Sequence, residues 1–164
     1  MDLLVKNNLL VAGLQSFKCS VGTNGLTHNK VEGDLCTPIG NYKFKEIFYR
    51  ADKLGKNDFL LPSTIITEND GWCDDPKSKF YNQHICFPFK ESAESLYRKD
   101  DLYDILFVID YNLDPILSGK GSAIFLHVSH PEFKSTHGCI AIEKTNIMKL
   151  AKIIDKRSRI KIEG

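Results

Sequence analysis

The chain lacks an apolar run of the roughly 20 residues that a membrane-spanning helix needs, so the sequence predicts no such helix. It also lacks a surplus of charge, because 22 Lys and Arg residues and 21 Asp and Glu residues leave a formal net charge of +1. A dedicated nucleic-acid-binding protein needs a basic face, which this balance does not favour. The basic residues between Lys152 and Lys161 are more typical of a solvated last helix and strand. We therefore expect neither a membrane span nor a nucleic-acid partner.

The first residues show no basic segment followed by a long apolar stretch, so no secretory signal peptide is visible. Cysteine is sparse and scattered. The cysteines are Cys19, Cys36, Cys73, Cys86 and Cys139. An odd count leaves at least one free thiol in a monomer, and it suits either a reducing compartment or up to two bridges. Nothing in the spacing places Cys73 and Cys86 in contact.

The remaining composition is that of an ordinary globular protein, with 42% hydrophobic and 26% charged residues. A length of 164 residues is enough to bury a core within one domain. No repeat, low-complexity tract or linker interrupts the sequence. We expect a single domain over residues 1–164.

Short alternating apolar segments between turn residues predict that β-strands dominate. Asn7-Asn8 separates two such segments, and because Asn tolerates positive φ, a tight hairpin turn is expected there. The expected strands cover residues 3–6, 9–12, 17–21, 42–44, 105–109, 123–128 and 157–162. The runs at 105–109 and 123–128 are typical of buried central strands.

Helical patterns are fewer. Residues 91–98 fit about two helical turns. Ile147, Leu150, Ala151 and Ile154 follow the spacing of one helix face, and Thr145 is the candidate N-cap. Residues 52–89 are rich in Pro, Asp and Asn and are expected to be irregular, as in loops that form the wall or lid of a site. The predicted fold class is mostly β (β-rich α+β) with a C-terminal helix.

Residues 125–141 carry the side chains best suited to chemistry. They place His127 at the end of an expected strand and, after a loop, Thr136-His137-Gly138-Cys139 before an apolar stretch. A nucleophilic cysteine needs a partner that stabilises its thiolate and backbone N–H groups that bind the oxyanion. Gly138 permits close backbone approach and unusual dihedral angles beside Cys139. We expect His127 to meet Cys139 and to lower the pKa of its thiol.

The same residue types have plainer interpretations. A lone cysteine is usually a small buried apolar residue, and a histidine at a strand end is usually only hydrogen-bonded, so the two interpretations of the pair are evenly balanced. His127, His130, His137 and Cys139 are all zinc-ligand types, but their spacing matches no familiar structural zinc site. We therefore predict no metal and no cofactor.

Several motifs, in the same order, resemble the L,D-transpeptidase catalytic-domain (YkuD-type) family. Thr136-His137-Gly138-Cys139-Ile140 resembles its core motif, and residues 121–127 resemble the strand that delivers its first histidine. Residues 30–34 and 37–40 resemble its charged segment and its Thr-Pro-x-Gly segment. Residues 70–76, 81–82 and 102–104 resemble a short bacterial branch. The likeness runs from about residue 21 to 150 and implies a β-sandwich or barrel domain.

Two departures from the better-known branch concern the substrate more than the chemistry. The spacer between the two histidines is shorter, and Ala141 stands where that branch has Asn or Arg. Any substrate contact or loop brace made by that polar side chain is missing here.

The resemblance implies a peptidoglycan L,D-transpeptidase, a cysteine acyltransferase. Cys139 would attack a stem tetrapeptide, release D-alanine and transfer the acyl group to an amine, with His127 as the base oriented by a backbone carbonyl such as that of Val128. Backbone around His137 and Gly138 would form the oxyanion hole. Candidate substrate contacts are Thr136, Trp72 and His130, although a core position is the more common one for Trp72.

The resemblance also implies peptidoglycan stem peptides as partners and carbapenem β-lactams as covalent inhibitors, and a monomer is expected. It implies a periplasmic or cell-envelope location, while a cytoplasmic one stays open because no signal peptide is visible. Three alternatives remain: an L,D-carboxypeptidase that hydrolyses the same acyl-enzyme, another cysteine amidase, and a non-catalytic peptidoglycan-binding module. Intact Cys139 and His127 argue against the module.

Overall fold

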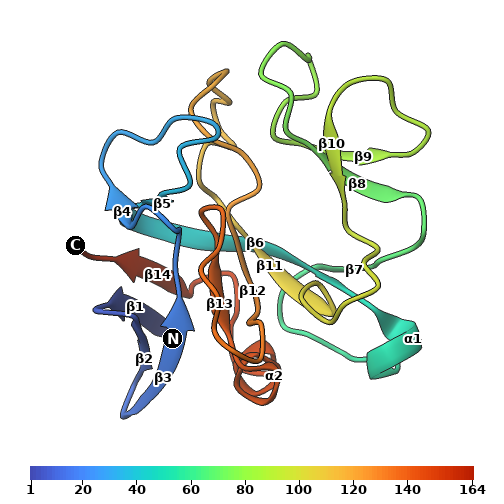
Figure 1. The fold of residues 1–164 in the computed structure, drawn as a ribbon. Coiled ribbons are helices and arrows are strands. Elements are labelled where there is room, and N and C mark those ends of the chain that lie inside the picture. Colours follow the sequence, from blue (N-terminus) through green and yellow to red (C-terminus); the bar gives the residue numbers. More distant parts are fainter.

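One large sheet dominates the computed structural model, which describes residues 1–164 (Figure 1). Its strands are β1 (Asp2–Lys6), β2 (Leu9–Ala12), β3 (Gln15–Ser20), β6 (Gly40–Tyr49), β7 (Ser63–Ile65), β11 (Ile105–Ile109), β12 (Phe125–Val128), β13 (Ile140–Ile142) and β14 (Arg159–Ile162). They lie in the order β11-β12-β13-β3-β2-β1-β14-β6-β7, and a further pairing of β11 with β6 closes the sheet into a barrel. The prediction of a mostly-β fold is confirmed.

The hairpin predicted at the N-terminus is present. β1 and β2 pair in antiparallel fashion, and Asn7 and Asn8 have φ values of 51° and 58°. Two consecutive residues with positive φ form the type I′ turn that matches the twist of the flanking strands. β1 also pairs in parallel with β14, so the two ends of the chain lie side by side in the barrel wall.

Side chains of the central strands point alternately into the barrel and out of it, and they form two separate apolar cores. Ile105, Phe107 and Ile109 of β11 face the barrel interior, whereas Leu106 and Val108 face outward into a second apolar cluster. β12 follows the same rule, since Leu126 and Val128 point inward and Phe125 points outward. Successive side chains of a strand point to opposite faces. His127 therefore emerges on the outer face of the barrel, beside the second cluster.

The second cluster is covered by a small sheet of β8 (Asp70–Cys73), β9 (His84–Cys86) and β10 (Ala93–Ser95), in the order β10-β8-β9 (upper right in Figure 1). Trp72 of this sheet packs edge-on against Phe48 and Phe125 of the barrel. A further small sheet joins β4 (Leu26–Thr27) to β5 (Thr37–Pro38).

Two expectations about this region are wrong. Residues 52–89 contain α1 (Ala51–Leu54), β7, β8 and β9, and the helix expected over 91–98 is replaced by β10. β10 pairs with β8, with Ala93 opposite Cys73. Pairing partners 20 residues apart override a local helical pattern, because strand preference depends on tertiary packing.

The C-terminal helix is α2 (Lys144–Ala151), and its predicted apolar face is confirmed. Ile147, Leu150 and Ala151 are buried in the barrel core, and Ile154 joins them just after the helix ends. The predicted cap is wrong, because Glu143 occupies the N-cap position and no side chain caps the helix. Neither α1 nor α2 has the length and apolar character that crossing a membrane requires.

Candidate active site

A pocket of about 450 Å³ opens on the outer face of the barrel, beside β12 and the loop that leads into β13. Cys139 and His127 both line it, and so do four other predicted site residues or their neighbours: Thr136, His137, His130 and Ser135. Cys139 immediately precedes β13, which pairs in parallel with β12 so that His127 lies opposite Ala141. The strand pairing therefore carries the two reactive side chains into one pocket.

The Cys139 thiol is held by backbone groups. Its sulfur donates a hydrogen bond to the carbonyl of Ala123 at 3.1 Å and accepts one from the N–H of Phe125 at 3.4 Å. Only 8% of the residue is exposed. In this state the thiol makes no hydrogen bond to His127, so the direct contact expected from the sequence is not formed.

The His127 imidazole is oriented by the chain itself. Its Nδ1 lies 2.8 Å from the carbonyl oxygen of Val128, which can only accept, so Nδ1 carries the proton. The ring packs edge-on against Tyr103, with 5.2 Å between ring centroids. Nε2 of the neutral ring is thereby left as a lone-pair acceptor, the form that a general base needs.

Burial keeps both reactive groups neutral. It raises the pKa of the Cys139 thiol to about 12, and the negative charge of Glu94 acts in the same direction, whereas the Phe125 N–H and Lys30 lower it. Burial also lowers the pKa of His127 to about 4. Both shifts oppose the thiolate–imidazolium pair expected from the sequence, because burial disfavours the charged form of each group.

The loop before Cys139 presents backbone donors to the pocket. Gly138 has a φ of 138°, and a Cβ there would lie 2.9 Å from the carbonyl oxygen of Cys36, so the close approach expected of this glycine is confirmed. Its N–H is occupied by the Thr136 hydroxyl at 3.1 Å, and that hydroxyl donates to the Cys139 carbonyl at 2.6 Å. The N–H groups of His137 and Cys139 make no hydrogen bond within the chain and remain available as donors.

Charged side chains that the sequence did not single out line the opposite wall. Glu94 and Arg98 lie there with Tyr103, whose hydroxyl donates to Glu94 at 3.0 Å. Burial raises the pKa of Glu94 to about 7. Glu32 lines the same wall and accepts hydrogen bonds from Tyr81 and from Ser122. The helix expected over residues 91–98 gave no indication that Glu94 and Arg98 line this pocket.

Tyr81 and Asn82 brace the segment that holds the thiol. The Tyr81 hydroxyl accepts from the N–H of Gly121 at 2.9 Å, and Asn82 Oδ1 accepts from the N–H of Ala123 at 3.0 Å. Asn82 Oδ1 also accepts from the indole N–H of Trp72 at 2.9 Å. A buried side-chain amide that makes several hydrogen bonds restrains the position of each group it binds. It positions the Ala123 carbonyl to which Cys139 donates.

The charged segment at residues 30–34 is a braced turn with one buried member. Asp34 accepts hydrogen bonds from the N–H groups of Val31 and Cys36 and pairs with Lys30. Lys30 is only 5% exposed, and its ammonium lies close to Gly138. Lys30 is therefore a buried member of this charged segment, whereas lysine side chains are usually exposed. Downstream, Thr37 ties the same loop to the N–H of Gly22.

Some predicted features lie away from the pocket. Trp72 is 3% exposed in the second core and does not line the pocket, so the structure places it in the core. Ala141 is fully buried within the barrel wall and adds no polar contact. All five cysteines are free, with Cys73 buried and Cys86 exposed.

Comparison with known proteins gives a family match over almost the whole chain. The family model described as "YkuD: L,D-transpeptidase catalytic domain" matches residues 3–162. No curated protein matches. Among solved structures, the chain resembles the helical cell shape determining protein Pgp2 from Campylobacter jejuni, with a TM-score of 0.50 and 18% sequence identity. The match covers 99% of this chain and 46% of that one, so this chain spans less than half of that protein's length, and the likeness shows the fold.

Proposed function

Because the chain belongs to the YkuD family of L,D-transpeptidase catalytic domains, we propose that it transfers acyl groups of peptidoglycan stem peptides through Cys139. Family membership indicates a cysteine-dependent enzyme that modifies peptidoglycan. In the proposed reaction, Cys139 attacks a stem tetrapeptide, D-alanine is released, and the acyl group is transferred to an amine.

One observation carries the proposal. Cys139 and His127 line the same pocket, and His127 donates its Nδ1 proton to the Val128 carbonyl, so the lone pair of the neutral ring is on Nε2. A cysteine and an oriented neutral imidazole are sufficient for acyl transfer, because sulfur is intrinsically nucleophilic and needs no third acidic residue.

The first half of the reaction begins when substrate displaces the thiol from the Ala123 carbonyl. The thiol proton passes to Nε2 of His127 as the sulfur attacks the scissile carbonyl carbon. The free N–H groups of His137 and Cys139 are the donors best placed to bind the resulting oxyanion. The imidazolium then protonates the leaving amine, and D-alanine departs from a thioester on Cys139.

The second half repeats these roles in reverse. His127 takes a proton from the acceptor amine, which attacks the thioester and restores the thiol. Water in place of the amine would give L,D-carboxypeptidase activity. Both routes use the same acyl-enzyme, so the acceptor that reaches the pocket decides between them.

The charged lining suits a zwitterionic peptide. Arg98 binds Asp100 through Nε and Nη2, which leaves Nη1 as a donor for a substrate carboxylate, and Glu32 and Glu94 can pair with a substrate ammonium group. Peptidoglycan stems carry both kinds of group, and their location places the proposed reaction in the cell envelope. Such a reaction would act on cell shape, the role named for Pgp2.

The test is release of D-alanine from a purified tetrapeptide stem, with and without an acceptor amine. Wild type should release D-alanine, and Cys139→Ser should lose release while still binding the stem. His127→Ala should lose roughly 10²- to 10⁴-fold in turnover, the range expected for general acid–base catalysis. His137→Ala should be milder, because its proposed role uses the backbone.

Two results would contradict the proposal. Equal release by wild type and Cys139→Ser, or stem binding with no release by either, would favour a peptidoglycan-binding module. A larger loss at His137 than at His127 would mean that the base is the other histidine.

A further inference from the structure

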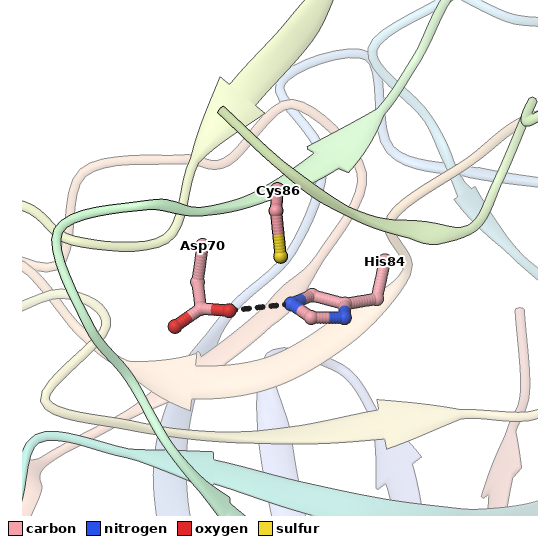
Figure 2. Close-up of side chains that lie close together, drawn as sticks. All are labelled: Asp70, His84 and Cys86. Atoms are coloured by element: carbon pink, nitrogen blue, oxygen red, sulfur yellow. Dashed lines mark hydrogen bonds and ion pairs between the residues drawn. The ribbon is translucent and has the colours of Figure 1, made fainter. Parts of the chain in front are cut away.

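A second cluster of reactive side chains lies on the small sheet, away from the pocket (Figure 2). Asp70 of β8 lies opposite Cys86 of β9, and His84 precedes Cys86 by two residues, so all three share one face of the sheet. Their carboxylate oxygen, imidazole nitrogen and sulfur lie within 4.8 Å of one another. Figure 2 shows the three side chains pointing toward a common point.

The surroundings fix the geometry of this cluster. Asp70 Oδ2 accepts hydrogen bonds from the Thr67 N–H at 2.6 Å and the Thr67 hydroxyl at 2.7 Å. Its other oxygen, Oδ1, lies 2.7 Å from Nε2 of His84. Phe48 packs against the His84 ring, with 5.1 Å between ring centroids. Hydrogen bonds to the outer oxygen of a carboxylate and packing against an imidazole are what orient metal ligands in proteins.

We propose that Asp70, His84 and Cys86 form a zinc site. Thiolate, imidazole and carboxylate are the three ligand types that zinc uses, and the sulfur disfavours magnesium and calcium, which take oxygen ligands. Three protein ligands leave one tetrahedral position for water. Zinc replaces the direct contact between His84 Nε2 and Asp70 Oδ1, and the Cys86 thiol loses its proton on binding.

Charge and location agree with this assignment. The Asp70 carboxylate and the thiolate that Cys86 forms on binding supply negative charge beside the cation. His84 and Cys86 are exposed, so an ion can reach the site from solvent. A bound ion would join β8 to β9 and so fix both ends of the loop that carries Tyr81 and Asn82. The zinc site is independent of the proposed acyl transfer, since none of its ligands lines the Cys139 pocket.

The experiment titrates the full metal-free chain with Zn²⁺ by calorimetry and with Co²⁺ by absorption spectroscopy. We expect one ion per chain, a near-ultraviolet thiolate-to-cobalt charge-transfer band and a higher thermal midpoint with zinc. Cys86→Ser should abolish the band, and His84→Ala should weaken zinc binding by more than the roughly 10- to 100-fold that loss of an outer hydrogen-bond partner costs. Cys86 is exposed, so its replacement by serine should leave the fold intact.

Two matched variants serve as controls. Cys36→Ser removes a thiol elsewhere on the chain, and Cys139→Ser removes the pocket thiol; both should keep the band and the affinity for zinc. Absence of stoichiometric binding by wild type would overturn the site. So would a band that survives Cys86→Ser or disappears in Cys139→Ser, because the metal would then be bound elsewhere.

Discussion

His127 shows how burial of a single residue shapes both chemistry and stability. It is 5% exposed, and burial lowers its pKa from 6.5 to about 4, so the folded chain holds it neutral where the unfolded chain would protonate it. Between those two pH values the unfolded state binds more protons, so stability must fall as the pH falls. The residue that the proposed reaction uses as a base therefore also makes the fold sensitive to acid.

We predict that His127→Gln flattens this acid sensitivity. A shift from 6.5 to about 4 corresponds to roughly 3 kcal/mol of unfolding free energy, present above pH 6.5 and lost progressively toward pH 4. Urea unfolding at several pH values measures the free energy of unfolding of wild type and of His127→Gln. The contributions of other titrating groups, such as Glu94, cancel in the difference between the two proteins. A difference that does not change between pH 4 and 7 would contradict a buried neutral imidazole.

Cys139 should react slowly with small electrophiles in the absence of substrate. Burial raises the pKa of its thiol to about 12, whereas Cys86 is exposed. Because the thiolate is the reactive form, iodoacetamide should label Cys86 of the metal-free protein before Cys139 at pH 7–8. Mass mapping of partly labelled protein measures the order. Fastest labelling at Cys139, with an inflection below about pH 8.5, would show instead that a thiolate–imidazolium pair forms before substrate binds.

At the level of elements, the small sheet and its loop support Cys139, the proposed nucleophile. Asn82 joins Trp72, in the core of that sheet, to the N–H of Ala123, whose carbonyl accepts from the thiol. Its amide nitrogen donates to the carbonyl of Asn112 at 2.7 Å. This one side chain thus couples the small sheet to the irregular segment that leads into β12.

We predict that Asn82→Ala costs about 3 kcal/mol of stability, because it leaves several buried polar groups without partners. Acylation of Cys139 should slow by roughly 10- to 100-fold even in the folded variant, since the thiol and the base lose their relative placement. Gln83→Ala is the matched control, because its amide makes only a 3.4 Å contact with the carbonyl of Lys79. Acylation rates and urea midpoints test both effects. Equal rates of Cys139 acylation in Asn82→Ala and Gln83→Ala would contradict a positioning role for Asn82.

The elements that could be predicted from the sequence are those whose conformation depends on residues close to them in the chain. The Asn7-Asn8 turn, the apolar runs of β11 and β12 and the apolar face of α2 each depend on neighbouring residues. β8, β9 and β10 were missed because their pairing joins residues far apart in the chain, and the residues between them look like loop or helix. The pocket wall formed by Glu94 and Arg98 was missed for the same reason.

The two principal site residues, by contrast, could be named from the sequence. Their residue types and spacing, together with the family motif, single out Cys139 and His127, and the structure places both in one pocket. Their protonation could not be inferred from sequence, because it depends on desolvation by Tyr103, Trp72 and other residues contributed by distant segments.

At the scale of the whole molecule, the barrel and the small sheet both contribute residues to the pocket. The closed barrel supplies His127 from β12 and Cys139 from the residue just before β13, and the small sheet packed on its outer face supplies Glu94, with Arg98 in the segment that follows β10 (Figure 1). The barrel positions Cys139 and His127, and the small sheet and the segments next to it line part of the same pocket. Differences in substrate within such a fold are therefore expected in the small sheet more than in the barrel.

Intact mass spectrometry after exposure to a carbapenem tests the central claim, that Cys139 is an acyl-accepting nucleophile, most directly. Carbapenems are expected to acylate the cysteine of this family. Wild type should gain the mass of one carbapenem, with the adduct on the peptide that contains Cys139, and Cys139→Ser should gain none. The absence of an adduct on wild type, or an adduct on Cys86 or another cysteine that persists in Cys139→Ser, would contradict the account.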